Sequence, residues 1–268
     1  MSTLNVSIVQ TELHWHDAER NLVHFSKIVA QRETEPHLVV LPEMFTTGFT
    51  MHARENAERM DGRSVAWMIE EAANTGAALC GSLIIEVDGE YYNRFILAHP
   101  NGFVEYYDKR HLFRLAGEHE HYSGGTKACT FLLNGWRIRP MVCYDLRFPV
   151  WSRNRDDYDL LVYVANWPER RHLAWETLIR ARAIENLAYV AAVNRIGKDG
   201  NDIRYVGGSA IVDYLGKNIV ELSNTSGMAS ASLDMAEMTK FRQQFPFHLD
   251  ADEFSLLSAG GERRIALP

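Results

Sequence analysis

The chain has 268 residues, 46% of them hydrophobic, and a formal net charge of −7 with a sequence pI near 5.9. No run of Lys and Arg is long enough to predict a nucleic-acid surface, and no apolar run approaches the roughly 20 residues that a membrane-spanning helix needs. The first ten residues lack the basic and apolar regions of a signal peptide, and three cysteines give no disulfide framework, so we predict a soluble protein of the cytoplasm.

Predicted strands and helices alternate over the first 76 residues. Asp17 is a good helix N-cap because its carboxylate accepts backbone N–H bonds, and Gly76 is a typical residue at a helix C-terminus. Pro42 interrupts the second strand. The strands cover 4–10 and 37–45, and the helices run from 17 to about 31 and over 64–75.

The remaining chain continues the alternation and adds antiparallel hairpins. Asp-Gly and Asn-Gly pairs favour tight turns at 87–90, 100–102 and 134–136. Together these patterns predict mixed sheets covered by helices in one domain. The later strands are expected at 159–168, 188–195 and about 228–233, and the later helices at 172–187 and about 235–244.

Two charged residues stand beside apolar runs in the first half of the chain. Glu43 lies just after an apolar run in "LPEMFTTGF", where a carboxylate is either a solvated strand end or a base in a pocket. Lys109 in "YYDKRHLF" interrupts a predicted aromatic strand, and such a lysine is either a snorkelling side chain or a cationic site residue. Taken alone, neither residue shows which of its two interpretations is correct.

Cys143 ends the apolar run of "RPMVCYDLRFP" and is followed at once by charged residues. A free cysteine is most often a small buried hydrophobe, and Cys80 and Cys129 fit that description. A thiol nucleophile, by contrast, needs a base to remove its proton and a donor where negative charge develops on the substrate. Glu43, Lys109 and Cys143 supply these three roles, and strand ends on one edge of a sheet can converge on a site.

Three segments, "LPEMFTTGF", "YYDKRHLF" and "VCYDLRFPVWSR", resemble the Glu, Lys and Cys signature segments of the nitrilase superfamily of carbon–nitrogen hydrolases. The resemblance covers nearly the whole chain, and "KRHLF", "YVANWP", "RARAIEN" and "FPFHLDADEF" are similar to its omega-amidase branch. It implies one α/β domain over residues 1–268, folded as the four-layer α-β-β-α sandwich of the superfamily, with a C-terminal tail from about 246 to 268. It also implies a homodimer and a hydrolase that needs no cofactor.

The resemblance assigns roles to the three residues. Cys143 would attack the carbonyl carbon of an amide, and Glu43 would take the thiol proton and pass it to the departing ammonia. The same carboxylate would then activate a water molecule that hydrolyses the thioester. Lys109 and the backbone N–H of Tyr144 would stabilise the oxyanion, a donor role whose removal costs on the order of 10²–10³ in rate. The implied substrates are small 2-oxo acid amides such as 2-oxoglutaramate and 2-oxosuccinamate.

A fourth catalytic residue is expected in "LFRLAGEHEHYSGG", because members of the superfamily carry a second glutamate after the lysine segment. Glu118 and Glu120 are both candidates. The branch pattern, E-H-x-H-Y, assigns the role to Glu118 and leaves Glu120 as a solvated loop charge. A carboxylate beside Lys109 would keep the lysine charged and fixed in place.

A 2-oxo acid carries a carboxylate, so its pocket should hold a cation, preferably the planar fork of an arginine. Arg171 is the first candidate, followed by Arg147 and Arg114, with surface solvation as the alternative for each. Trp167 is placed to form a pocket wall if its strand ends beside the strand of the nucleophile. We expect Asp145 and Arg147 to hold the turn after the nucleophile rather than to react.

Other functions stay open at this point. "GEHEHY" with His111 and "HWH" could bind a metal, but the chain lacks the H-E-x-x-H spacing and the cysteine pair of a zinc site. A non-catalytic relative would bind a small molecule without turnover, which the presence of all three reactive residues argues against. Nitrile or N-carbamoyl amide hydrolysis would use the same three residues. We predict a small-molecule amide substrate, no metal, no cofactor, and no nucleic-acid or membrane partner.

Overall fold

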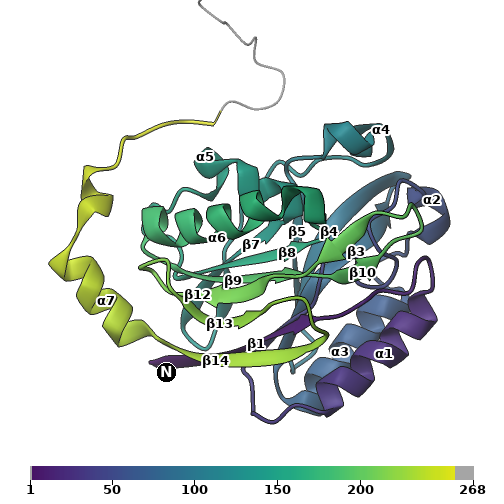
Figure 1. Ribbon diagram of the computed structural model, residues 1–268, viewed down its shortest axis with the longest axis horizontal. Helices are drawn as coiled ribbons and strands as arrows, with labels where there is room; N and C mark the ends of the chain where they lie inside the picture. The colour runs from purple at the N-terminus through teal and green to yellow at the C-terminus, as the bar shows by residue number, and fades with distance from the viewer. Residues whose placement is uncertain (1, 257–268) are drawn as a thin grey trace, which may run out of the picture.

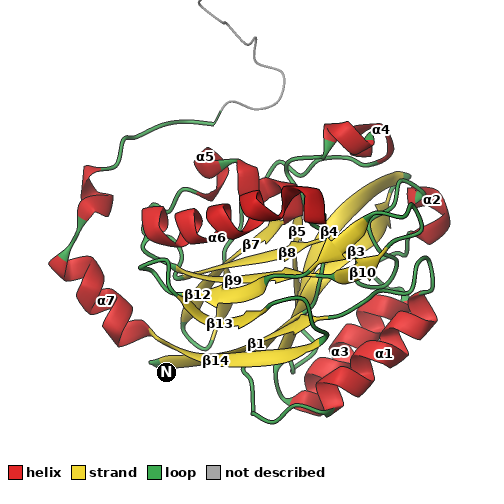
Figure 2. Ribbon diagram, in the orientation of Figure 1, coloured by secondary structure: helices red, strands yellow, loops and turns green. Residues whose placement is uncertain are grey.

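The structure is a computed structural model that describes residues 2–256. Two six-stranded sheets pack face to face, and helices cover the outer face of each sheet, as Figure 1 shows. The layers therefore follow the order α-β-β-α, which the colouring by secondary structure makes plain (Figure 2). The α/β sandwich predicted from the sequence is confirmed.

The first sheet has the strand order β14-β1-β2-β3-β4-β5. Strand β2 pairs in parallel with both β1 and β3, and the remaining pairs are antiparallel. The six strands are β1 (Thr3–Gln10), β2 (Leu38–Val40), β3 (Ala78–Val87), β4 (Glu90–Ala98), β5 (Val104–Asp108) and β14 (Gly227–Asp234).

The second sheet has the order β13-β12-β9-β8-β7-β6, in which β7, β8 and β9 run parallel. A separate hairpin, formed by β10 and β11, follows β9. The sheet strands are β6 (Phe131–Leu133), β7 (Trp136–Val142), β8 (Leu160–Ala165), β9 (Tyr189–Asn194), β12 (Ser209–Val212) and β13 (Asn218–Leu222), and the hairpin strands are β10 (Ile196–Lys198) and β11 (Arg204–Val206).

The helices form the two outer layers and the connections at the ends of the sandwich. Helices α1 and α3 lie on the first sheet, while α5 and α6 lie on the second (Figure 1). Asp17 caps α1 as predicted, since its Oδ1 accepts the N–H of Arg20 at 3.0 Å, and Gly76 ends α3 with a φ of +67°. The helices are α1 (Ala18–Ala30), α2 (Ala53–Asn56), α3 (Arg63–Thr75), α4 (Glu118–His121), α5 (Pro149–Ser152), α6 (His172–Asn186) and α7 (Met235–Gln244).

Burial on both faces explains the uninterrupted apolar runs of the central strands. Every residue of β2, β8 and β9 is buried, as is usual for parallel strands covered on both sides. Phe25 of α1 and Met68 of α3 share one apolar cluster with Val39 of β2. Trp175 of α6 shares a second cluster with both sheets, including Ile8 of β1. Packing from both sides therefore accounts for an apolar side chain at nearly every position of these strands.

Two predicted boundaries were wrong. Strand β2 stops at Val40, because Pro42 lacks the N–H that a sheet ladder needs; the predicted interruption at Pro42 is confirmed, but the strand does not resume over 43–45 as the predicted range 37–45 implied. Lys109 follows β5 and does not interrupt it. Among residues 2–256, no helix is long and apolar enough to cross a membrane. The predicted tail begins in the described part with a 3-10 helix, Phe247–Asp250, and its last residues lie outside the described range.

Candidate active site

The predicted site residues come together at one end of the sandwich, from both sheets. Glu43 follows β2 and Lys109 follows β5 in the first sheet. Cys143 follows β7 and Asn166 follows β8 in the second. The expectation of a site on the edge of a single sheet was therefore wrong. The carboxyl ends of parallel strands meet at the same edge, and the two facing sheets close around the site from opposite sides.

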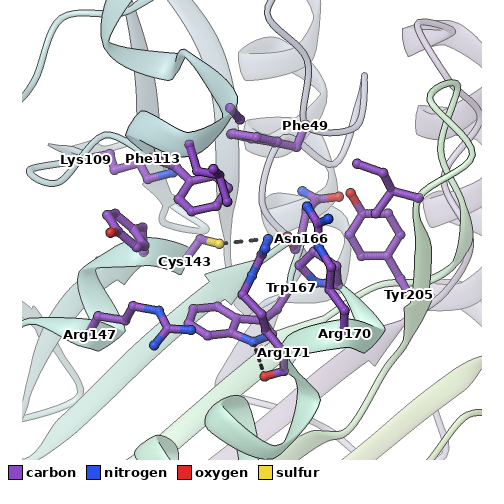
Figure 3. A pocket seen from close by; sticks show the side chains of 15 residues that line it. Phe49, Lys109, Phe113, Cys143, Arg147, Asn166, Trp167, Arg170, Arg171 and Tyr205 are labelled. Carbon is purple, nitrogen blue, oxygen red and sulfur yellow. Dashed lines mark hydrogen bonds between the residues drawn. The ribbon is translucent and has the colours of Figure 1, made fainter.

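Cys143 sits in a strained turn directly after β7. Its φ is +45°, a left-handed value that is uncommon for a residue with a side chain and costs on the order of 1–3 kcal/mol. The residue begins a 3-10 helix, Cys143–Arg147, and its thiol lies 3.9 Å from the backbone oxygen of Asn166 (Figure 3). The turn places the sulfur at the strand exit, and the N–H of Tyr144 is among the first amides of the 3-10 helix, which have no partner inside it.

Asp145 holds this turn, as predicted. Its buried carboxylate accepts the N–H of Val142 and the N–H of His111, each at 3.0 Å. The hydroxyl of Tyr107 donates to the same carboxylate at 2.8 Å. Asp145 therefore joins the nucleophile turn to the segment that carries Lys109.

Lys109 lies between two buried carboxylates. Its Nζ is 3.0 Å from Oε1 of Glu43 and 2.8 Å from Oε1 of Glu118, and all three side chains are at most 1% exposed. The side-chain amide of Asn93 on β4 also donates to Glu43 Oε1, at 2.8 Å. These contacts fix the ammonium and the Glu43 carboxylate relative to each other.

Burial and charge set the protonation states of the cluster. Burial lowers the pKa of Lys109, but the carboxylates of Glu118 and Glu43 outweigh it, so this pKa is raised and the lysine stays charged. Burial raises the pKa of Glu118, the charge of Lys109 opposes this, and the nearby carboxylate of Glu43 adds to the rise, so the net pKa lies above its ordinary value. Burial, followed by the carboxylate of Glu43, raises the pKa of Cys143 well above its ordinary value. The thiol therefore rests protonated and needs a base beside it to react.

The two neighbouring glutamates of α4 occupy different environments, as the sequence pattern predicted. Glu118 is fully buried, and its Oε2 accepts the N–H of Phe113 at 2.5 Å as well as a hydrogen bond from Lys109 at 3.0 Å. The side chain of Glu120 is 68% exposed. Only Glu118 reaches the cluster.

A cavity of about 250 Å³ opens in front of Cys143 and Lys109 (Figure 3). Tyr144, Trp167 and Arg171 all line it, so the structure brings the three predicted substrate-binding residues together. Trp167 is nearly fully buried, and its indole N–H donates to the backbone oxygen of Arg171 at 2.7 Å. This bond fixes the wall of the cavity that the indole forms.

The other arginine predictions fare differently. Arg147 was expected to hold the turn and was also the second candidate for a substrate carboxylate; its guanidinium lies 4.9 Å from the centre of the Trp167 ring and lines the cavity, as the second of these requires. Arg114, the third candidate for a substrate carboxylate, is not among the lining residues. Arg170 does line the cavity and was missed, although the pair of arginines after "NWPE" was visible in the sequence.

Asn166 is a further residue that sequence reasoning missed. Its backbone N–H donates to Oε2 of Glu43 at 2.7 Å, and its side-chain amide donates to the backbone oxygen of Glu43 at 2.7 Å. It lines the cavity together with Phe49 and Tyr205. Its place after an apolar run and inside the segment "YVANWP" did not indicate its partner, because Glu43 lies 123 residues away.

Two of the residues considered for a metal, His111 and Glu118, have other partners. His111 Nδ1 lies 2.7 Å from Asp145 Oδ1, and Glu118 is bound to Lys109. Within residues 2–256, no three His, Cys, Asp or Glu side chains gather in a group that could hold a metal ion. The donor set at this end of the sandwich instead suits acid–base and nucleophilic chemistry.

The sandwich and this donor set define a class: a hydrolase acting on carbon–nitrogen bonds. The sequence profile of the carbon-nitrogen hydrolase family matches residues 5–243, and the chain belongs to that family. This confirms the nitrilase-superfamily resemblance seen in the sequence.

Individual relatives narrow the resemblance to the omega-amidase branch. The chain is 46% identical over 260 residues to a Yersinia enterocolitica protein named omega-amidase YafV, covering 96% of this chain and 100% of the relative. It is 30% identical to a Bacillus subtilis 2-oxoglutaramate amidase, covering 90% of this chain and 95% of that one. The crystal structure of XC1258 from Xanthomonas campestris, a CN-hydrolase superfamily protein with an arsenic adduct in its active site, superposes with a TM-score of 0.93 at 45% identity, over 96% of this chain and 100% of that one.

Proposed function

We propose that this protein is an omega-amidase, which hydrolyses the terminal amide of a small 2-oxo acid amide to the acid and ammonia. 2-Oxoglutaramate and 2-oxosuccinamate are the expected substrates. One observation carries the reaction class: the Lys109 ammonium is held between Glu43 and Glu118 at the cavity that exposes Cys143. The names of the relatives support the substrate class, since they are an omega-amidase and a 2-oxoglutaramate amidase.

The first half of the reaction forms a thioester. The Cys143 sulfur attacks the amide carbon while Glu43 accepts the thiol proton, so that a free thiolate is never required in the buried site. The oxyanion forms against the ammonium of Lys109 and the N–H of Tyr144, donors that the fold holds in place before the substrate arrives. Glu43 then gives its proton to the nitrogen, the carbon–nitrogen bond breaks, and ammonia leaves.

In the second half, Glu43 takes a proton from water, and the thioester is hydrolysed. A water molecule takes the place of the ammonia, and Glu43 accepts one of its protons as the oxygen attacks the thioester carbon. The oxyanion again faces Lys109 and the N–H of Tyr144. The carbon–sulfur bond breaks, the departing sulfur takes the proton from Glu43, and the carboxylic acid product leaves, which restores the thiol and the carboxylate. Glu118 acts throughout by keeping Lys109 charged and fixed.

Trp167 and Arg171 are proposed to hold the far end of the substrate. The guanidinium of Arg171 lies 4.8 Å from the centre of the Phe113 ring, at the cavity, where its planar fork suits a carboxylate. The Trp167 indole offers an apolar surface to the short carbon chain. A cavity of about 250 Å³ fits a substrate of this size.

Ammonia release across a panel of compounds tests the substrate class. We expect the highest kcat/KM with 2-oxoglutaramate or 2-oxosuccinamate, and much lower values with a simple nitrile and an N-carbamoyl compound. Glutamine and asparagine complete the panel as amides without a 2-oxo group. Turnover of the nitrile or the N-carbamoyl compound alone would contradict the omega-amidase proposal and leave the family membership intact.

The homodimer and the cytoplasmic location stay predictions. The homodimer rests on the sequence resemblance, and the cytoplasmic location rests on the cysteine content of the chain. Neither a cofactor nor a metal is required by the proposed steps, because the chain's own thiol, carboxylates and ammonium supply every proton transfer and the nucleophile.

A further inference from the structure

The cavity wall carries an unbalanced charge. Among the fifteen residues that line it, four are basic and none is acidic. Lys109 is one of the four, and Glu43 and Glu118 balance its charge from behind. The other three are Arg147, Arg170 and Arg171, which we call the cationic rim.

The rim arginines have no acidic partners in the described part of the chain. None of the three forms an ion pair with an Asp or Glu of residues 2–256. Glu169, the acidic residue next to them in the sequence, pairs instead with Arg204 at 3.4 Å.

Aromatic rings, and not carboxylates, hold two of the rim arginines in position. Arg147 lies over Trp167 and Arg171 over Phe113, contacts that position a guanidinium without neutralising it. Figure 3 shows the three arginines grouped around Trp167. Burial lowers the pKa of Arg171, and the charge of Arg170 lowers it further, as expected for like charges at close range. The fold therefore maintains a positive cavity mouth.

We propose that the cationic rim selects the substrate by the group at C2. It accepts an amide with a 2-oxo group, such as 2-oxoglutaramate, and rejects the corresponding 2-amino acid, glutamine. This inference rests on the proposed function and adds Arg147 and Arg170 to the residues that determine specificity. A 2-oxo acid amide carries one negative charge, which the rim attracts. Glutamine carries an ammonium beside its carboxylate, and this ammonium would meet three repelling guanidinium groups and no carboxylate on the wall.

The amino acid must bring its ammonium into the cavity, and the 2-oxo acid has no charge at that position. An ammonium that leaves water needs an acceptor, and an unpaired charge in a partly buried site is strongly disfavoured. The uncharged 2-oxo group has no such requirement. The discrimination therefore depends on charge, and it should respond to ionic strength.

Arg170 is the best position for a test, because it is exposed and no aromatic contact holds it, so its replacement leaves the walls intact. We expect Arg170→Gln to lower the ratio of kcat/KM for 2-oxoglutaramate to that for glutamine about tenfold. Added salt should lower this ratio in the wild type and have a weaker effect in the variant. Arg114→Gln is the matched control: it removes the same charge from an exposed position that does not line the cavity, and it should leave the ratio unchanged.

A charge reversal gives the sharper test. Arg170→Glu supplies the missing carboxylate, so we expect the ratio to fall about a hundredfold, with kcat/KM for glutamine equal to or above the wild-type value. The inference is overturned if both Arg170 variants keep the wild-type ratio, or if Arg114→Gln lowers it as much. Failure of the proposed function looks different: the wild-type enzyme would then not release ammonia from 2-oxoglutaramate at all.

Discussion

Replacing Cys143 with alanine should abolish ammonia release from 2-oxoglutaramate, with a loss of about 10⁴-fold or more in kcat. Without the sulfur there is no atom to form the thioester, and a water molecule in its place has neither the nucleophilicity of the thiol nor its fixed position. Alanine keeps the Cβ that makes a φ of +45° unfavourable, so the substitution should leave this strain unchanged and the fold should persist. The thermal unfolding midpoint of the variant checks that point.

Cys129→Ser is the matched control for this substitution. Cys129 is half-buried and lies outside the cavity, so its replacement should leave kcat near the wild-type value. A folded Cys143→Ala variant that kept a substantial rate would remove Cys143 from the mechanism. Equal losses in both variants would point to a general effect of cysteine replacement.

Glu118→Ala should cost about 10²–10³ in kcat, and Glu120→Ala should stay near the wild type. Glu118 contacts the ammonium of Lys109 with both carboxylate oxygens, at 2.8 Å and 3.0 Å. Without Glu118, the Lys109 ammonium loses one of its two carboxylate partners and is no longer held in place as the oxyanion donor. The KM should change less than kcat, because Glu118 does not line the cavity where the substrate binds.

The two α4 variants are compared by steady-state kinetics, and Glu118→Gln distinguishes catalysis from folding. Glutamine keeps the size of the side chain and can still accept a hydrogen bond from Lys109, but it lacks the charge. We expect it to fold normally and to lose most of the activity. Near-normal rates in both Glu118 variants would exclude Glu118 from the mechanism, and a large loss in Glu120→Ala would move the role to Glu120.

The catalytic set could be predicted because each member stands in a local pattern. Glu43 and Cys143 each come after an apolar run, Lys109 stands beside an aromatic one, and the segments around them resemble known signatures. The choice between Glu118 and Glu120 came from the branch pattern alone. Burial separates the two in the structure, because only the first turns inward from the short helix α4.

The parts that escaped prediction depend on contacts between distant segments. Asn93 and Asn166 touch Glu43 across separations of 50 and 123 residues, and no local pattern indicates such partners. The arrangement of the site between two sheets has the same origin, since strand pairing is set by packing in three dimensions. Two uses were considered for Arg147, in the turn and at the substrate carboxylate, and its place over the Trp167 ring at the cavity depends on a contact that no local pattern indicates.

Domain size and strand character were easier to predict than strand ends. Apolar runs buried on both faces identify β8 and β9 directly. The end of β5 is less visible, because "YYDKRHLF" continues with large side chains after the sheet pairing stops. Hydrogen-bond pairing with β4 decides that boundary, and it places Lys109 just beyond the strand.

Trapping the acyl-enzyme is the most direct measurement of the proposed chemistry. The wild-type enzyme is mixed with 2-oxoglutaramate, quenched with acid during turnover, and digested for mass spectrometry. We predict the mass of the 2-oxo acyl group on the peptide that contains Cys143, together with its absence from the peptides of Cys80 and Cys129. Ammonia release without an acyl group on Cys143, under conditions where a synthetic thioester survives the quench, or an acyl group on another residue, would contradict thioester catalysis at this site.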